Sequence, residues 1–210
     1  QPNALLDQRD AMVKTLSGYV GISAVAENDG TMSVYTTNGQ SLVSGSNAYP
    51  LSTGGNAYDA TRSDIFDSSG NNITTRLSGG SLGALLGYRT NVLDPVQNQL
   101  GQAALALASS VNAQQAKGLD LNGKQGGAIF SLPSPVVLGS SANQGSADVT
   151  AKISDVSKLT ASDYVLSYDG SQWNLHTTGG QSVALAANPD GSLSADGLTF
   201  NVSGAAQAGD

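Results

Sequence analysis

The residues best suited to catalysis are few, and the only histidine, His176, is the first candidate. A Ser-His-Asp triad needs a single imidazole as its base, and serine and aspartate are plentiful in the chain. His176 follows Leu175 in a stretch whose alternation predicts the return strand of a hairpin. This position favours an exposed strand residue over a catalytic base.

Carboxylate pairs are the second candidate, because glycoside hydrolysis needs two carboxyl groups at a fixed separation. Glu27 is the only glutamate, and it lies in a predicted turn. Asp64 and Asp67 flank an apolar pair, but Asp67 opens the stretch Asp-Ser-Ser-Gly, whose composition is typical of a turn. The turn interpretation is therefore favoured over an acid–base pair.

Two glycine-containing stretches resemble ligand-binding loops only in part. The stretch 120–123 reads Asp-Leu-Asn-Gly, but Ser131 stands where a calcium loop has its last glutamate. Gly79 and Gly80 are not followed by the Lys-Ser/Thr of a phosphate loop. We expect a plain turn at 120–123, with Gly83 and Gly87 allowing close helix approach, and we expect no metal and no cofactor.

Three aromatic residues of the C-terminal region, Tyr164, Tyr168 and Trp173, offer a possible platform for stacking a sugar ring. Cross-strand aromatic residues more often pack on each other or on a sheet face. Packing is therefore the favoured interpretation, and a ligand role stays open as the alternative.

Composition excludes several classes of protein. The net charge is −7, and only nine Lys and Arg are spread along 210 residues, which argues against a nucleic-acid partner or an anionic membrane surface. Cysteine is absent, so disulfides and cysteine-ligated zinc are excluded. No apolar run reaches the roughly 18 residues of a membrane span, and no secretory signal is visible. Because the sequence opens with Gln1, we expect an internal piece of a longer protein.

Two segments have a helical pattern. Residues 3–17 place Leu6, Val13 and Leu16 on one stripe, and residues 79–118 carry two interleaved rows with heptad spacing. The first row is Leu86, Leu93, Leu100 and Leu107, and the second is Leu82, Arg89, Val96, Ala103 and Ser110. Proline disrupts a helix interior but suits its first position. Pro95 therefore predicts two helices, at about 81–92 and 95–117, spanning roughly 55 Å together at ~1.5 Å per residue.

The rest of the chain predicts strands. Alternation around the Asn38-Gly39 turn predicts a three-stranded meander within residues 20–43, residues 44–63 are expected to be loop, and a further hairpin is expected around Ile65 and Ile73. We predict an α+β fold: an elongated, partial helical bundle with an inserted β-hairpin or meander region at 1–127, with strands between 19 and 78. An outer all-β domain at 128–210, a small barrel or sandwich truncated at its C-terminus, follows.

The exposed positions of the long helical segment are Gln, Asn, Ser and Ala rather than Glu and Lys. A free surface helix usually carries charges there, so this helix is expected to be surrounded by others. Only residues 3–17 offer a comparable stripe within the chain. The bundle is therefore incomplete by itself.

The two helical segments carry a resemblance to a known family. NALLDQRDAMVKTLSGYVGI at 3–22 and GGSLGALLGYRTNVLDPVQNQLGQAALALASSVNAQQAKGLDLNG at 79–123 resemble the FlgK-type family of flagellar hook-associated proteins. TASDYVLSYDGSQWNL and DGLTFNVSG, in the last third of the chain, look like the outer β domain of that family. The resemblance covers essentially the whole chain.

The resemblance implies a non-catalytic structural protein that self-assembles at the junction between flagellar hook and filament. It implies as partners copies of the protein in a ring, the hook protein, a neighbouring hook-associated protein on the filament side, and an export chaperone that binds the terminal regions. It also implies an extracellular location reached through the flagellar type III export apparatus. The alternative is an extracellular adhesion module that binds through residues 128–210, and a cell-wall hydrolase is disfavoured for lack of a carboxylate pair.

We hypothesise that ten residues of the two helical segments act in helical packing or assembly. They are Leu6, Arg9, Val13, Leu16, Leu82, Leu86, Arg89, Leu93, Leu100 and Leu107. Arg9 and Arg89 are unusual because charge is unexpected on such rows. Each either forms a salt bridge at the bundle edge or a subunit contact, or keeps its charged end in water along an apolar stem.

Overall fold

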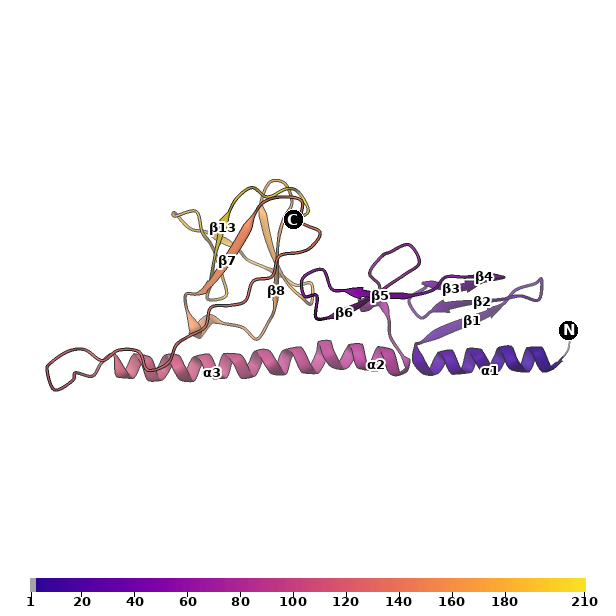
Figure 1. Cartoon of the computed structure of the whole chain (residues 1–210), viewed down its shortest axis with the longest axis horizontal. Coiled ribbons are helices and arrows are strands. Elements are labelled where there is room, and N and C mark those ends of the chain that lie inside the picture. The colour runs from indigo at the N-terminus through magenta and orange to yellow at the C-terminus, as the bar shows by residue number, and fades with distance from the viewer. Residues whose placement is uncertain (1–2) are drawn as a thin grey trace. The chain divides into compact units, whose positions relative to one another are not determined.

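The computed structural model describes residues 3–210, which divide into two compact units, one ending at Asp94 and the other running from Pro95 to Asp210. Both units combine helical segments with antiparallel strands, as the predicted α+β class requires (Figure 1). The predicted domain boundary at 127/128 stays a prediction.

The first unit contains two helices with strands between them. Helix α1 (Asn3–Tyr19) precedes the strands, and α2 (Gly80–Tyr88) follows them after the short 3-10 helix η1 (Thr74–Arg76). In Figure 1, α2 starts where α1 ends, and the first strands lie alongside the helices. The segments that lead from α1 into the strands and from the strands into α2 are hydrogen-bonded to each other here: the Gly21 amide donates to the Ser78 carbonyl at 2.8 Å.

A four-stranded sheet in the order β1-β2-β3-β4 fills most of the insert. Its strands are β1 (Ile22–Ala26), β2 (Met32–Thr36), β3 (Ser41–Ser44) and β4 (Asn47–Ala48). The predicted three-stranded meander is thus present, and the short β4 extends it. The Asn38-Gly39 turn lies between β2 and β3, and Gly39 has the positive φ of 84° that glycine allows.

A two-stranded ribbon of β5 (Ser52–Gly55) and β6 (Ser63–Phe66) corrects two expectations. Residues 44–63 were expected to be loop, yet they contain β4 and β5. The expected hairpin between Ile65 and Ile73 is present only as a short one: it has the Phe66–Asn72 bridge and two amide bonds, from Ile73 to the Ile65 carbonyl and from Asp67 to the Asn71 carbonyl, while β5 supplies the ladder for β6. The Ser-Thr-Gly-Gly sequence of β5 has no apolar alternation, so sequence pattern alone could not reveal it.

The core of the first unit connects helices and strands. Buried Val20, Ile73 and Leu77 form its centre, and the partly buried residues around it are Leu16, Ile22, Leu51, Ile65, Leu82 and Leu86. Ile73 is fully buried. The core therefore fixes one side of α1 and α2 against the strands.

The second unit combines α3 (Asp94–Gln115, of which Asp94 belongs to the first unit) with two antiparallel sheets. One sheet has the order β10-β9-β8, and the other has the order β11-β12-β13-β7. Their strands are β7 (Asp148–Ile153), β8 (Tyr164–Tyr168), β9 (Trp173–Thr177), β10 (Ser182–Val183), β11 (Ala186–Ala187), β12 (Leu193–Ala195) and β13 (Leu198–Ser203), with the 3-10 helix η3 (Val156–Lys158) after β7.

Both sheets of the second unit share one core. Leu175 of β9 packs with Ala151, Ala195, Leu198 and Phe200 of the other sheet. Of the two expected forms, a barrel or a sandwich, the strands of the described residues do not close into a barrel. Two sheets packed over a common core are the arrangement found.

The two helices predicted at about 81–92 and 95–117 are present as α2 and α3, although α2 ends earlier, at Tyr88, and no loop separates them. Between α2 and α3 the chain forms a π-helical turn, η2 (Arg89–Leu93), so helical backbone continues from Gly80 to Gln115. The Asp94 amide donates to the Arg89 carbonyl, five residues back. Such a turn holds one residue more than an α-turn, which loosens the helix immediately before the proline that has no amide to donate.

Candidate assembly surface

Helix α1 presents two faces of different character. Leu6, Arg9, Val13 and Leu16 are half-buried, as their common row predicts, although only Leu16 reaches the described core. On a second face, Leu5, Met12 and Tyr19 are spaced by seven and are each about 60% exposed (60%, 62% and 61%). No residue of α1 is fully buried, so the helix is covered on one side only.

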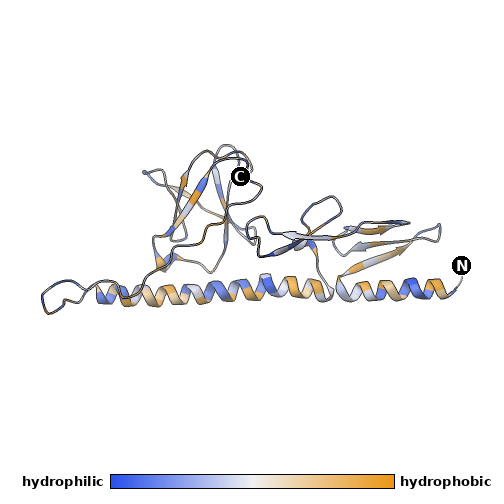
Figure 2. Cartoon of the chain, in the orientation of Figure 1, coloured by the Kyte–Doolittle hydropathy of each residue, from blue (hydrophilic) through white to orange (hydrophobic). Residues whose placement is uncertain are grey.

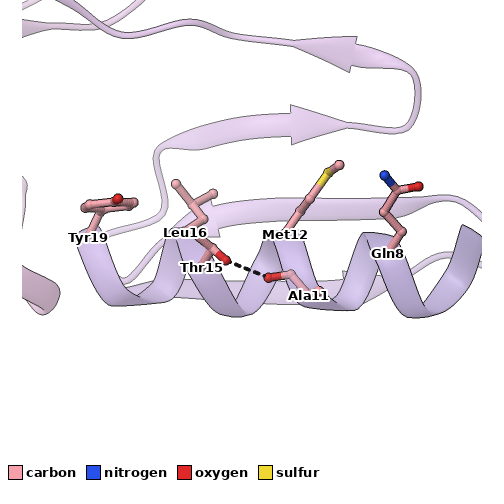
Figure 3. Close-up of a pocket in the computed structure, with 6 residues that line it drawn as sticks. All are labelled: Gln8, Ala11, Met12, Thr15, Leu16 and Tyr19. Carbon is pink, nitrogen blue, oxygen red and sulfur yellow. Dashed lines mark hydrogen bonds between the residues drawn. The ribbon is translucent and has the colours of Figure 1, made fainter.

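A shallow depression of about 370 Å³ lies along α1. Figure 3 shows Gln8, Met12, Leu16 and Tyr19 projecting from the same side of the helix around it. Within the helix, the Thr15 hydroxyl donates to the Ala11 carbonyl at 2.9 Å, so this polar group is already bonded. The remaining lining is apolar apart from the Gln8 amide, which suits a protein side chain better than a charged ligand.

The leucine rows of the second helical segment change environment at the π turn. Leu82 and Leu86 before the turn, and Arg89 at its first position, are half-buried. Leu93 at its last position is 41% exposed, and Leu100 and Leu107 of α3 are 71% and 66% exposed, although heptad spacing puts all three on the row of Leu86. The half-buried positions of α3 are Asp94, Pro95, Asn98, Gln102, Leu105, Ala108, Ser109, Val111 and Asn112.

The half-buried face of α3 carries both polar and apolar side chains. On this face, the Asn112 side chain binds the segment that follows α3. Its oxygen accepts from the amides of Ile129 and Phe130 at 2.8 and 2.9 Å, and its nitrogen donates to the Phe130 carbonyl at 2.8 Å.

We use the name outer stripe for the exposed large apolar side chains of the helices, taken separately in the first unit (α1, α2 and η2) and in the second unit (α3). Its members are Leu5, Met12 and Tyr19 on α1, Leu85, Tyr88, Val92 and Leu93 on α2 and η2, and Val96, Leu100 and Leu107 on α3. Apolar residues recur along all three helices in Figure 2. Single exposed leucines are ordinary, but apolar residues that repeat along a helix indicate a surface that a partner covers.

Charge is missing from the outside of the second helical segment. Between Gly80 and Gln115 the only charged residues are Arg89 and Asp94. Both are half-buried and paired within the chain: Arg62 contacts both Asp94 carboxylate oxygens at 2.9 and 3.1 Å, and an Arg89 nitrogen lies 3.9 Å from Asp64. The outer surface of α2 and α3 therefore consists of neutral side chains alone.

The two arginines singled out by their rows differ. Arg89 reaches the Asp64 carboxylate, whose side chain is 4% exposed and also accepts from the Asn56 and Asn72 amides at 2.8 Å each. Within residues 3–210, Arg9 forms its ion pair with the neighbouring Asp10, which is exposed. Arg89 thus forms a salt bridge to a buried carboxylate, whereas Arg9 is a half-exposed arginine that pairs with the exposed residue next to it.

The other candidates for chemistry have structural explanations. His176 is half-buried in β9, where full exposure was expected. Asp120 accepts from the amides of Asn122 and Lys124 at 2.8 Å, as a plain turn does. The rings of Tyr168 and Trp173, which face each other across β8 and β9, are 5.1 Å apart and tilted by 45°, which is a packing geometry.

The glycines at the start of α2 include a motif match that sequence reasoning missed. Residues 79–83 fit the spacing G-x-S-x-G, but Ser81 opens a helix that no strand precedes, so the strand–turn–helix context of a nucleophilic serine is missing. Gly83 approaches the Ser78 backbone of its own chain, where an added Cβ would lie 2.6 Å from the carbonyl carbon, and a Cβ on Gly87 would contact only the Asn91 side chain, at 3.7 Å. The expected helix–helix approach through these two glycines is not what the structure has.

Within residues 3–210 no helix has the length and apolarity needed to cross a membrane. In the same range no three His, Cys, Asp or Glu side chains gather as metal ligands would.

Comparison with known proteins gives a consistent match over the whole chain. Residues 1–130 match the family model described as the helical domain of flagellar hook-associated protein FlgK, and residues 138–210 match the D2-like domain of flagellar hook-associated protein 1. Flagellar hook-associated protein 1 of Salmonella typhimurium is 39% identical over 100% of this chain, and that of Escherichia coli K12 is 36% identical over 97%.

A solved structure agrees with the sequence relatives. The flagellar hook junction protein FlgK from Burkholderia pseudomallei matches with a TM-score of 0.88 and 37% identity, over 99% of this chain and 40% of its own. The chain likewise spans 39% of the Salmonella relative and 38% of the Escherichia relative.

Proposed function

The chain belongs to the family of flagellar hook-associated protein FlgK, and on that premise we propose that it acts as a structural protein that self-assembles at the junction between hook and filament. The observation that carries the proposal is the run of exposed apolar residues of the outer stripe on α2, η2 and α3, where residues 80–115 carry no exposed charge. Exposed apolar residues that repeat along an uncharged helix are typical of a surface that other helices cover.

The residues of the helical rows take two roles in this proposal. The half-buried Leu6, Val13, Leu16, Leu82 and Leu86 hold the helices to their own chain, and the exposed Leu93, Leu100 and Leu107 receive neighbouring helices. Covering a leucine side chain contributes about 1.5–3 kcal/mol, so a few such contacts per copy stabilise an assembly. Residues 1–127 would form the assembling domain and residues 128–210 an outer domain.

The partners that follow are copies of the same protein in a ring, the hook protein on one side and another hook-associated protein on the filament side. The protein would leave the cell through the flagellar type III export apparatus, with a chaperone bound to terminal regions of the longer protein. Its role in this proposal is structural, with no catalytic step and no cofactor. The adhesion-module alternative is not favoured, because the Tyr168–Trp173 pair that suggested it packs against itself.

A complementation experiment tests the proposal. The full-length gene is placed in a motile bacterium of the same species that lacks its own junction protein, and filaments are counted by electron microscopy. Restored filaments are expected, while hooks that stay bare and shed filament protein into the medium would contradict the junction role. A second strain carrying the gene without residues 128–210 tests whether the outer domain is dispensable for assembly.

A further inference from the structure

Strand β1 forms one edge of the four-stranded sheet in the first unit. Just before the strand, the Thr37 amide donates to the Gly21 carbonyl at 3.0 Å, in the register that β1 keeps with β2. In an antiparallel ladder every second residue bonds to the partner strand, so the odd positions of β1 face β2 and the even positions face away. The amide and carbonyl groups of Ala24 and Ala26 therefore point to the free edge. Within residues 3–210 neither of these two amides has another partner.

Strand β1 lacks the features that usually protect a sheet edge. Natural sheets protect their edges with charged side chains, prolines, bulges or very short strands. β1 has the sequence Ile-Ser-Ala-Val-Ala, without charge or proline, and its register with β2 is uninterrupted. The side chains of residues 23–26 are exposed. This edge is therefore suited to accept another strand.

Other sheet edges in the described part of the chain are protected. Strands β4, β10 and β11 contain two residues each, and β7 carries the charged Asp148 and Lys152. On β8, the Tyr168 amide donates to the Asp210 carbonyl at 2.8 Å, and the Tyr168 carbonyl accepts from the Gly209 amide at 2.8 Å. Compared with these edges, β1 is uncharged, uncovered and long enough to pair.

The second unit contains a segment with the matching property. Residues 131–139 have no helix, strand or turn, and within the described residues none of their backbone groups forms a hydrogen bond. The three residues after Pro135 are exposed: Val136 by 84%, Val137 by 41% and Leu138 by 51%. Branched apolar side chains favour strands, and a proline is tolerated where a strand begins. Residues 136–138 therefore form a segment that is suited to a strand but has no sheet to join.

We propose that the free edge of β1 receives residues 136–138 of a second copy as an added strand. The backbone groups of the two segments bond to each other, as they do when a sheet edge binds an extended peptide. Neither segment contains a charged residue that pairing would bury.

The contact fits an assembly of many copies. Because each copy carries one edge and one segment, the same contact repeats from copy to copy, and such a head-to-tail contact closes a ring when its rotation allows. The inference rests on the proposed function, since it presumes that copies lie next to each other. It deepens that function by naming a contact between copies outside the outer stripe.

Engineered disulfides test the contact, because the chain contains no cysteine of its own. The full-length protein carries Val137→Cys together with Ala24→Cys or, in a second variant, with Val25→Cys, so that both faces of the added strand are sampled. Paired strands place opposite Cα atoms about 4.5–5.5 Å apart, which permits a disulfide. In flagella isolated from the complementation strain, we expect one of the two variants to form a ladder of multimers in the absence of reductant.

The controls are the single-cysteine variants and Ala48→Cys with Val137→Cys, which moves the first cysteine to the exposed β4 at the opposite edge. All of them are expected to stay monomeric. The inference would be overturned by the absence of multimers from both test variants, by a disulfide within one chain, or by dimers from Ala24→Cys alone, which would mean that two β1 edges pair with each other.

Proline substitution tests the backbone pairing in the variant that forms the ladder. Ala26→Pro removes an amide that faces away from β2, so the ladder between β1 and β2 stays intact. Leu138→Pro removes an amide from a segment without secondary structure, so the test remains valid even if Ala26→Pro fails to fold. Each is expected to reduce the multimers at least tenfold, whereas Val136→Ser, which keeps every amide, leaves them unchanged. Undiminished multimers in both proline variants would contradict the strand contact.

Failure of the inference and failure of the proposed function give different results. If the cysteine-free parent restores filaments but neither test variant forms multimers, the junction role stands and only the strand contact is wrong. If the parent restores no filaments, the proposed function is wrong and the inference falls with it.

Discussion

Gly80 at the start of α2 lies directly against Tyr19 at the end of α1, so closely that a Cβ on Gly80 would be 2.3 Å from the Tyr19 carbonyl carbon. The helices thus meet end to end in the first unit, with the strand insert leaving and re-entering at Gly21 and Gly79. The negative end of one helix dipole faces the positive end of the next, which is a favourable arrangement.

Replacing Gly80 with alanine is expected to destabilise the first unit by about 3 kcal/mol. The new methyl group would overlap the Tyr19 backbone, and the φ of +60° at this position is strained for alanine. Urea unfolding followed by tyrosine fluorescence measures the loss. Gly101→Ala in α3 is the matched control: it has open space around it and is expected to stabilise by about 0.5–1 kcal/mol. Equal midpoints for both variants would contradict the close contact.

Arg89→Met is expected to cost about 1–2 kcal/mol of unfolding free energy, because it leaves the buried Asp64 carboxylate without its cation. Arg9→Met is the paired control, since Arg9 contacts an exposed neighbour and its removal should change stability by less than about 0.5 kcal/mol. Thermal denaturation of both variants measures these losses of stability. A larger loss for Arg9→Met would reverse the roles given to the two arginines.

Acid is expected to weaken the fold through a repeated turn. Six aspartates accept hydrogen bonds within their own turns, in most cases from the residue two positions later and, for Asp67, chiefly from Asn71. These bonds hold the pKa of each carboxyl below its ordinary value of 3.8. The six are Asp29, Asp59, Asp67, Asp155, Asp169 and Asp190. The folded state favours the charged form, so this stabilisation is complete above the unfolded pKa and is lost as pH falls through the folded values.

Carboxyl NMR titration checks this prediction, with Asp169 as the most informative group. Its pKa is depressed by the Gln172 amide first, then by the Ser171 hydroxyl and the Asn174 amide. We expect the Asp169 signal to keep its charged shift down to the lowest pH at which the protein stays folded, and Ser171→Ala to raise its pKa. A normal titration near 3.8 would contradict the turn geometry.

The sequence predicted elements whose signals are local. The Asn38-Gly39 turn, the alternation of Tyr164 and Leu166, and the row through Leu6 and Val13 each specify a strand or a helix face without help from distant residues. Strand β5 was not predicted, because its Ser-Thr-Gly-Gly sequence has no apolar alternation and pairs with β6 through its backbone.

The π turn was not predicted for a different reason. Asp94-Pro95 fits a helix start as well as it fits a loosened turn, and the ion pairs that distinguish the two come from Arg62 and Asp64, some thirty residues earlier. The heptad rows were correct in spacing, but their burial was not predictable. Leu86 packs against the core of the first unit, whereas Leu100, two heptads later on the same row, is 71% exposed.

The central claim is that the outer stripe of the helices is the surface through which this protein assembles. Its most direct test is the fraction of filament-bearing cells when Leu100→Ser and Leu107→Ser are introduced together in the complementation strain, compared with Val136→Ser, an exposed apolar residue outside the helices. We expect the double variant to lower that fraction at least tenfold, since two apolar contacts of about 1.5–3 kcal/mol each are lost per copy, and the control to leave it unchanged. Filaments at normal numbers from the double variant, exported at normal levels, would contradict the account.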